Sequence, residues 1–125
     1  MYQKLRKHAR SVSESPSVAV GSGGAVYLSA FAMRQFFKGV KQVHLLYDPE
    51  ARKLAVQVAK DADPDAFRLN FSNKTASTGV VAARSVVKQL GLDYTKETLV
   101  YPAEWNDRLK ALEVDLRSVP QKRRR

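Results

Sequence analysis

Three aspartates at alternate positions, Asp61, Asp63 and Asp65, are the part of the sequence most similar to a metal-binding loop. Alternating carboxylates also open a calcium-binding EF-hand loop, which needs glycine at its sixth position and glutamate at its twelfth. Those positions hold Ala66 and Ser72 here. We therefore interpret the segment as an exposed acidic linker that binds no divalent cation tightly.

The other reactive side chains do not form a recognisable catalytic pattern. The two histidines, His8 and His44, have no second metal ligand at a useful spacing. The chain has no cysteine and no Gly-x-Ser-x-Gly sequence, which excludes disulfides, cysteine nucleophiles and a serine nucleophile elbow. Residues 21–24 are rich in glycine but lack the Walker lysine and the dinucleotide fingerprint, so we interpret them as a turn. We expect no enzymatic activity, no cofactor and no metal.

Basic side chains remain, and they gather at the two ends of the chain. The net charge is +10, and residues 1–16 carry four basic side chains against one glutamate. Residues 117–125 carry five basic side chains and no acidic one. Cationic tails of this kind commonly neutralise nucleic-acid phosphates, although simple solvation also explains them. We predict nucleic-acid binding, with the last residues as a disordered cationic tail.

Further basic residues lie between the tails, and two of them occupy matching positions in an internal repeat described below. Either a basic face or ordinary solvated helix residues would explain Arg34 and Lys88. The candidate nucleic-acid-binding residues are Lys4, Arg6, Lys7, Arg10, Arg34, Lys38, Lys41, Lys74, Arg84, Lys88, Lys122, Arg123, Arg124 and Arg125.

The repeat relates the two halves of the chain. Residues 24–36 align without a gap on residues 78–90, at an offset of 54. Residues 45–47 match residues 99–101 at the same offset, and residues 55–58 match 111–114 after a two-residue insertion. Each copy therefore predicts a strand, a short helix ended by Gly39 or Gly91, and a hairpin.

Hydrophobic alternation and turn residues place the individual elements. In the first half we expect strands at 18–20, 25–28, 42–47 and 54–58, with a helix over 30–38 capped by Ser29. In the second half we expect strands at 66–71, 79–82, 97–103 and 109–116, with a helix over 83–90. Phe67, Leu69 and Phe71 should share one face of their strand.

Four strands and one helix cannot bury both of their faces alone. We therefore predict an α+β, mostly β domain over residues 18–116: a small closed barrel of two pseudo-symmetric strand–strand–helix–strand–strand repeats, 18–60 and 66–116. A flexible basic arm, 1–17, and a basic tail, 117–125, flank this single domain. No apolar run is long enough to span a membrane, and no apolar stretch follows the basic N-terminus as in a secretory signal. We expect a cytoplasmic protein without membrane contact.

The order of parts resembles the AbrB-type swapped-hairpin barrels and the related double-psi β-barrels. The resemblance covers residues 18–116 in layout and is carried by the segments 24–39 and 79–91. Ser29 and Ala83 stand where that class usually has proline, and its helical arginine pattern survives only as Arg34 and Arg84. The resemblance implies a DNA-binding module, commonly a transcription regulator or an antitoxin.

These observations favour a nucleic-acid-binding protein, DNA before RNA, that acts mainly through electrostatics and has a weak sequence preference. A regulatory role would agree with the resemblance. The alternative is a structural or adaptor protein of a phage or a ribonucleoprotein, whose arms become ordered on a partner. A homo-oligomer or a larger assembly is compatible with both.

Overall fold

The computed structural model describes residues 15–60, 63–71, 77–92, 94 and 97–124. Its strands are β1 (Ser17–Gly21), β2 (Ala25–Leu28), β3 (Gln42–Asp48), β4 (Lys53–Val58), β5 (Phe67–Arg68), β6 (Asn70–Phe71), β7 (Gly79–Ala82), β8 (Glu97–Asn106), β9 (Ala111–Asp115) and β10 (Gln121–Arg124). Its helices are α1 (Ala30–Phe36) and α2 (Arg84–Val87), with short 3-10 turns η2 (Ser22–Gly24) and η3 (Lys88–Leu90). Neither helix of this described part is long and apolar enough to cross a membrane.

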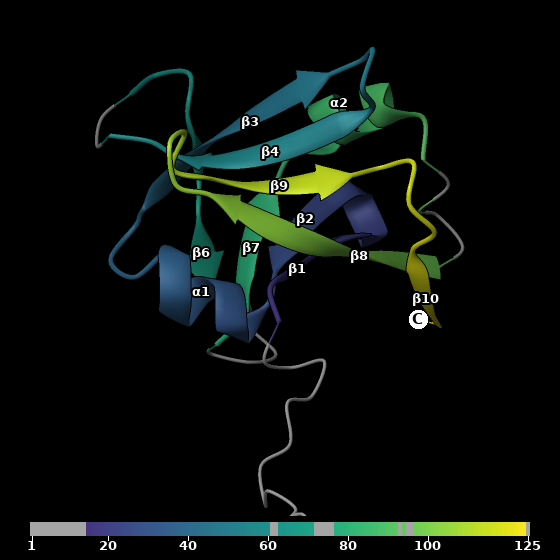
Figure 1. The fold of residues 1–125 in the computed structure, drawn as a ribbon, viewed down its shortest axis with the longest axis horizontal. Helices are drawn as coiled ribbons and strands as arrows, with labels where there is room; N and C mark the ends of the chain where they lie inside the picture. Colours follow the sequence, from purple (N-terminus) through teal and green to yellow (C-terminus); the bar gives the residue numbers. More distant parts are fainter. Residues whose placement is uncertain (1–14, 61–62, 72–76, 93, 95–96, 125) are drawn as a thin grey trace, which may run out of the picture.

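The strands form one antiparallel sheet that curves into a nearly closed barrel (Figure 1). Their order is β5-β3-β4-β9-β8-β1-β2-β7-β6, with β10 added beside β8. The two ends of this order, β5 and β6, are separated in the chain by Leu69 alone. One extended segment therefore pairs with β3 on one side and β7 on the other, which leaves few free edges. The predicted mostly-β, barrel-like class is confirmed.

The long strand β8 connects the two parts of the barrel. Residues 99–102 pair with β1, residues 103–106 pair with β9, and residues 97–100 pair with β10. Leu99, Val100, Tyr101 and Ala103 are its buried side chains, and exposed residues alternate with buried ones only from Tyr101 to Glu104. Leu99, Tyr101 and Ala103 point into the barrel. They join the core that β1, β2, β4 and β9 line with valine and leucine.

Helix α1 is tied to β1 at its N-terminal end. The hydroxyl of Ser29 accepts a hydrogen bond from the Ala32 N–H at 3.3 Å and another from the Ser17 N–H at 3.1 Å. The predicted N-cap therefore also anchors β1. The helix ends at Phe36, two residues earlier than predicted, and Gly39 then takes a left-handed conformation with φ of 75°.

The two long hairpins share one type of turn. Asp48 Oδ1 accepts hydrogen bonds from the backbone N–H groups two and three residues later, at 3.0 and 3.1 Å. Asn106 Oδ1 does the same at 3.1 and 3.2 Å. Arg52 and Lys110 close these turns with φ of 55° and 53°. Matching the hairpins by their turns makes Tyr47 correspond to Trp105, whereas the sequence alignment pairs Tyr47 with Tyr101.

The predicted strand over residues 66–71 is interrupted. It divides into β5 and β6 because its two ends pair with different strands, β3 and β7. Leu69 is 6% exposed and belongs to the core, but Phe71 is 60% exposed. Phe67, Leu69 and Phe71 were expected to share one face of a single strand, but they differ in burial, and Phe71 is the exposed one.

The C-terminal segment also differs from the prediction of a disordered tail. Residues 121–124 form β10 and pair with residues 97–100 of β8. This stretch of β8 continues past the end of β9, so its edge would otherwise be unpaired.

Deleting residues 119–125 should therefore lower the free energy of unfolding by about 1–3 kcal/mol, because several backbone hydrogen bonds are lost and each contributes about 0.5–1.5 kcal/mol net. Denaturant titration followed by the fluorescence of Trp105, the single tryptophan, measures this change. Lys122→Gln is the control, since it changes charge and keeps the strand. Unchanged stability of the truncated protein would contradict the pairing of β10.

Candidate functional site

A groove of about 620 Å³ lies beside α1. We call it the α1 groove. It is bounded by α1, the loop between α1 and β3, and the segment that forms β6. Its lining residues are Met33, Arg34, Phe37, Lys38, Gly39, Val40, Lys41, Leu69, Asn70, Phe71 and Ser77. This set combines an apolar surface with three basic side chains and contains no carboxylate.

The groove is built on close packing of α1 against the barrel. Gly79 of β7 has no room for a side chain, since a Cβ there would meet the sulfur of Met33. Phe37 is 1% exposed and contacts Trp105 edge to face, with ring centroids 5.8 Å apart. Trp105 in turn stacks on Phe36 at 4.5 Å. These contacts hold α1 in place, so the groove is preformed.

Three cations surround this apolar surface. Arg34, Lys38 and Lys41 are all exposed. Lys41 is fixed relative to the opposite wall, because its backbone carbonyl accepts a hydrogen bond from the Leu69 N–H at 2.9 Å. Within the described ranges, three ion pairs are present: His44–Asp63, Lys110–Asp107 and Arg117–Asp115. None of them involves a cation of the groove. The groove therefore presents concentrated positive charge over an apolar floor.

The remaining predicted binding residues do not gather there. Arg84 and Lys88 are exposed on α2 and η3, and Figure 1 places α2 on a different side of the barrel from α1. A single basic face containing both Arg34 and Lys88 is therefore not formed. Arg123 and Arg124 belong to β10. Outside the described residues lie Lys4, Arg6, Lys7, Arg10, Lys74 and Arg125.

A second cavity, of about 490 Å³, lies beside β10. Its lining residues are Gly91, Leu92, Glu97, Leu99, Tyr101, Pro120 and Lys122. Both signs of charge are present in this lining, whereas the described lining of the α1 groove contains basic side chains alone. Burial raises the pKa of the Tyr101 hydroxyl, and the nearby Arg52 charge opposes that rise.

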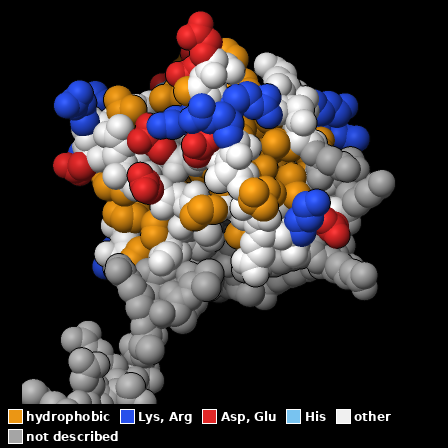
Figure 2. Space-filling model, turned by 45° about the vertical axis from the view of Figure 1, so that its right-hand side comes forward, with side chains coloured by type: hydrophobic (Ala, Val, Ile, Leu, Met, Phe, Trp, Pro, Cys, Tyr) orange, Lys and Arg blue, Asp and Glu red, His pale blue; other side chains and the backbone are white. Residues whose placement is uncertain are grey.

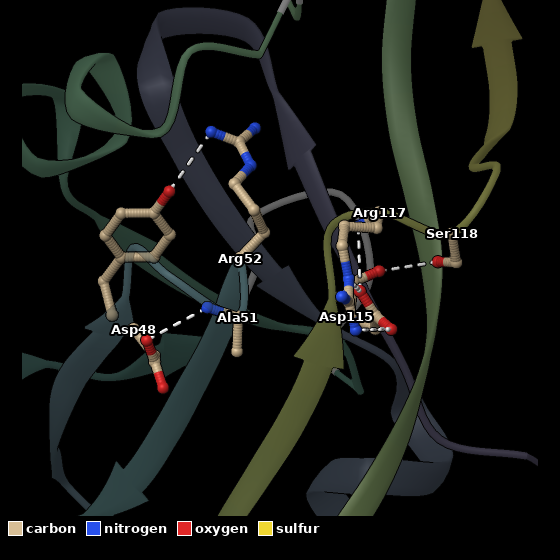
Figure 3. Close-up of polar contacts among 7 residues, drawn as sticks. Asp48, Ala51, Arg52, Asp115, Arg117 and Ser118 are labelled. Atoms are coloured by element: carbon tan, nitrogen blue, oxygen red, sulfur yellow. Dashed lines mark hydrogen bonds and ion pairs between the residues drawn. The ribbon is translucent and has the colours of Figure 1, made fainter.

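Two basic residues outside both hollows, Arg52 and Arg117, are engaged by the protein itself (Figure 3). Arg52 donates to the Tyr47 hydroxyl at 3.2 Å and to the Leu90 carbonyl at 3.1 Å, which ties the β3–β4 turn to η3. Arg117 donates to the Asp115 carboxylate at 3.2 Å, and these hydrogen bonds lower the pKa of Asp115. Figure 2 shows basic and acidic side chains close together on this side of the molecule.

The acidic linker is less free than the sequence suggests. Asp63 Oδ2 lies 2.9 Å from His44 Nε2, and both side chains are about two-thirds covered, at 32% and 26% exposed. Asp63 is therefore only partly exposed, whereas Asp65 is exposed as expected and Asp61 lies outside the described residues. His44 has one carboxylate beside it, which the spacing in the sequence did not indicate. Among the described residues, no group of three or more metal-ligating side chains is present.

Comparisons with family models, with curated proteins and with solved structures found no match. The α1 groove is therefore the candidate functional site on the strength of its own side chains. Sequence reasoning identified its cations one by one, but missed Phe71 and the apolar floor. An aromatic residue at the end of the strand over 66–71, beside a polar loop, was the available signal.

Proposed function

We propose that this protein binds nucleic acid, DNA before RNA, through the α1 groove and the basic segments at its two ends. The observation that carries the proposal is the lining of the groove, where Arg34, Lys38 and Lys41 surround an apolar floor without a carboxylate. Lysine and arginine side chains that neutralise phosphates release condensed counterions, which drives binding of any sequence. Among its described lining residues, the groove offers only Asn70 and Ser77 as uncharged polar side chains, so a weak sequence preference follows.

We also infer that the barrel derives from two duplicated halves. Read around the barrel with β5–β6 as one segment, the strand order stays the same when each strand of the first half is exchanged with one of the second half. The exchanged pairs are β1 with β5–β6, β2 with β7, β3 with β8 and β4 with β9. The matching turns of the two hairpins agree with this exchange. Gly39 lines the α1 groove and Gly91 lines the second cavity, each after a helix. If so, the α1 groove and the second cavity are equivalent positions in the two halves, and only the α1 groove has become strongly basic.

The alternative function is a structural or adaptor protein. It is favoured by apolar side chains left in water, above all Val119, which is 90% exposed, and Leu109, which is 41% exposed. Such a protein would engage a protein partner and would bind nucleic acid weakly or not at all.

The deciding experiment is binding of the full chain to duplex DNA, single-stranded DNA and structured RNA, measured by fluorescence anisotropy over about 0.05–0.5 M salt. The logarithm of the binding constant should fall linearly with the logarithm of salt, by about 0.7–0.9 per neutralised phosphate. Absence of binding at the lowest salt, or an affinity independent of salt, would contradict the proposal and favour the adaptor.

A further inference from the structure

Phe71 is an exposed aromatic side chain on a fixed piece of backbone. At 60% exposure it is the one aromatic among the large hydrophobic side chains that the described part of the chain leaves exposed. Its strand β6 pairs with β7, where Phe71 lies opposite Gly79. Exposure of a large apolar ring to water is unfavourable, so a ligand that covers the ring would gain from its burial.

The surroundings of Phe71 specify the chemistry of such a ligand. The groove that it lines also has the partly buried Val40 and the three cations already described, over a floor that includes the buried Phe37. The matching ligand must therefore carry a planar apolar part and negative charge a few bonds away. A nucleotide of a nucleic-acid strand has both, in its base and its phosphate.

Whether the bases are paired determines which form of nucleic acid, a single strand or a duplex, fits the groove. In a duplex the bases are stacked on one another, and the backbone presents sugars and phosphates to a protein. A phosphate held over the apolar floor would lose water without gaining a hydrogen bond, which is unfavourable. An unpaired base can instead stack on an aromatic ring while its phosphates reach the cations.

We propose that the α1 groove binds single-stranded nucleic acid, with one unpaired base stacked on Phe71 and its neighbouring phosphates on Arg34, Lys38 and Lys41. The amide of Asn70, the adjacent lining residue, offers both a donor and an acceptor to the edge of that base. This inference rests on the proposed function and narrows it to unpaired strands, for which the sequence had given no preference.

The test compares Phe71→Leu and Phe71→Tyr in the full chain, with oligothymidylate and a duplex of equal length as probes. When an aromatic side chain that stacks on a base is replaced by a smaller one, the affinity for the strand falls by about 5- to 150-fold. Phe71→Leu should show this loss of affinity for oligothymidylate and no change for the duplex. Phe71→Tyr, which keeps an aromatic ring, should bind oligothymidylate as tightly as the unchanged protein does. The salt slope should stay unchanged, because no charge is altered.

Leu109→Ala is the matched control, since it shortens an exposed apolar side chain outside the groove. It should leave both affinities unchanged. Polyglutamate, added as a competitor at equal charge, should displace oligothymidylate poorly, because it has anionic groups without a planar ring.

The possible results separate the two proposals. Equal binding of single strand and duplex with no effect of Phe71→Leu, or full displacement by polyglutamate, would overturn the stacking inference and leave electrostatic binding in place. A salt-dependent preference for the duplex would overturn the inference in the same way. Failure of both probes to bind at low salt would overturn the inference and the proposed function together.

Discussion

Replacing Gly24 with alanine should lower the free energy of unfolding by about 2–6 kcal/mol. Two costs combine at this position. Gly24 has φ of 75°, a conformation that strains residues with a side chain. An added Cβ would also lie 2.6 Å from the Cα of Arg84, so the start of α2 would have to move. Backbone cannot yield as the end of a flexible side chain does.

The neighbouring Gly23 provides a control for this prediction. It has nearly the same backbone angle, with φ of 72°, but an added Cβ meets nothing within 4 Å. Gly23→Ala should therefore cost only the backbone strain, about 1–3 kcal/mol. Alanine reduces the entropy of the unfolded chain equally in both variants. Equal losses in denaturant titrations would show that α2 does not press against this turn.

Changing Arg34, Lys38 and Lys41 together to glutamine should weaken binding to a single strand about 100-fold at about 0.1 M salt. Each phosphate contact contributes about 0.7 to the salt slope on single strands, so the slope should become shallower by about 2. All three side chains are exposed, so stability should change little. Anisotropy titrations across a salt series give both quantities.

A second triple variant separates local from overall charge. Lys53, Arg84 and Lys88 are also exposed cations, and they lie outside the groove. Their replacement by glutamine changes the net charge by the same amount. It should shift the slope by less than about one unit, because no bound phosphate is released. If the two triple variants behaved alike, binding would depend on total charge and the α1 groove would not be a site.

Local signals in the sequence were sufficient for much of the fold. Ser29 precedes an apolar run, and its hydroxyl caps α1 as expected. Gly39 and Gly91 both adopt the left-handed conformation that ends a helix. Most strand positions followed from alternation and from turn residues, which act over a few residues and are therefore readable without a structure. The closing hairpin is an exception, because β8 runs three residues past its predicted end at Ala103 and the turn lies at residues 107–110.

The groove depends on contacts between distant residues, which periodicity does not encode. Met33 approaches Gly79 across 46 positions of sequence, and that approach brings α1 next to β6. Alternation counted Phe71 with Leu69 because it does not record which strand each residue pairs with. The pairing of β10 with β8 and the contact of His44 with Asp63 were missed for the same reason.

The position of β8 and β9 between β1 and β4 has a consequence for synthesis on the ribosome. Residues 97–115 are made late, yet they fill the gap between two strands that are complete by residue 58. At about 5–20 residues per second, the nascent chain waits roughly 3–11 s for this insertion. During that interval β1 and β4 lack these neighbours, so their unpaired edges can pair with strands of other chains.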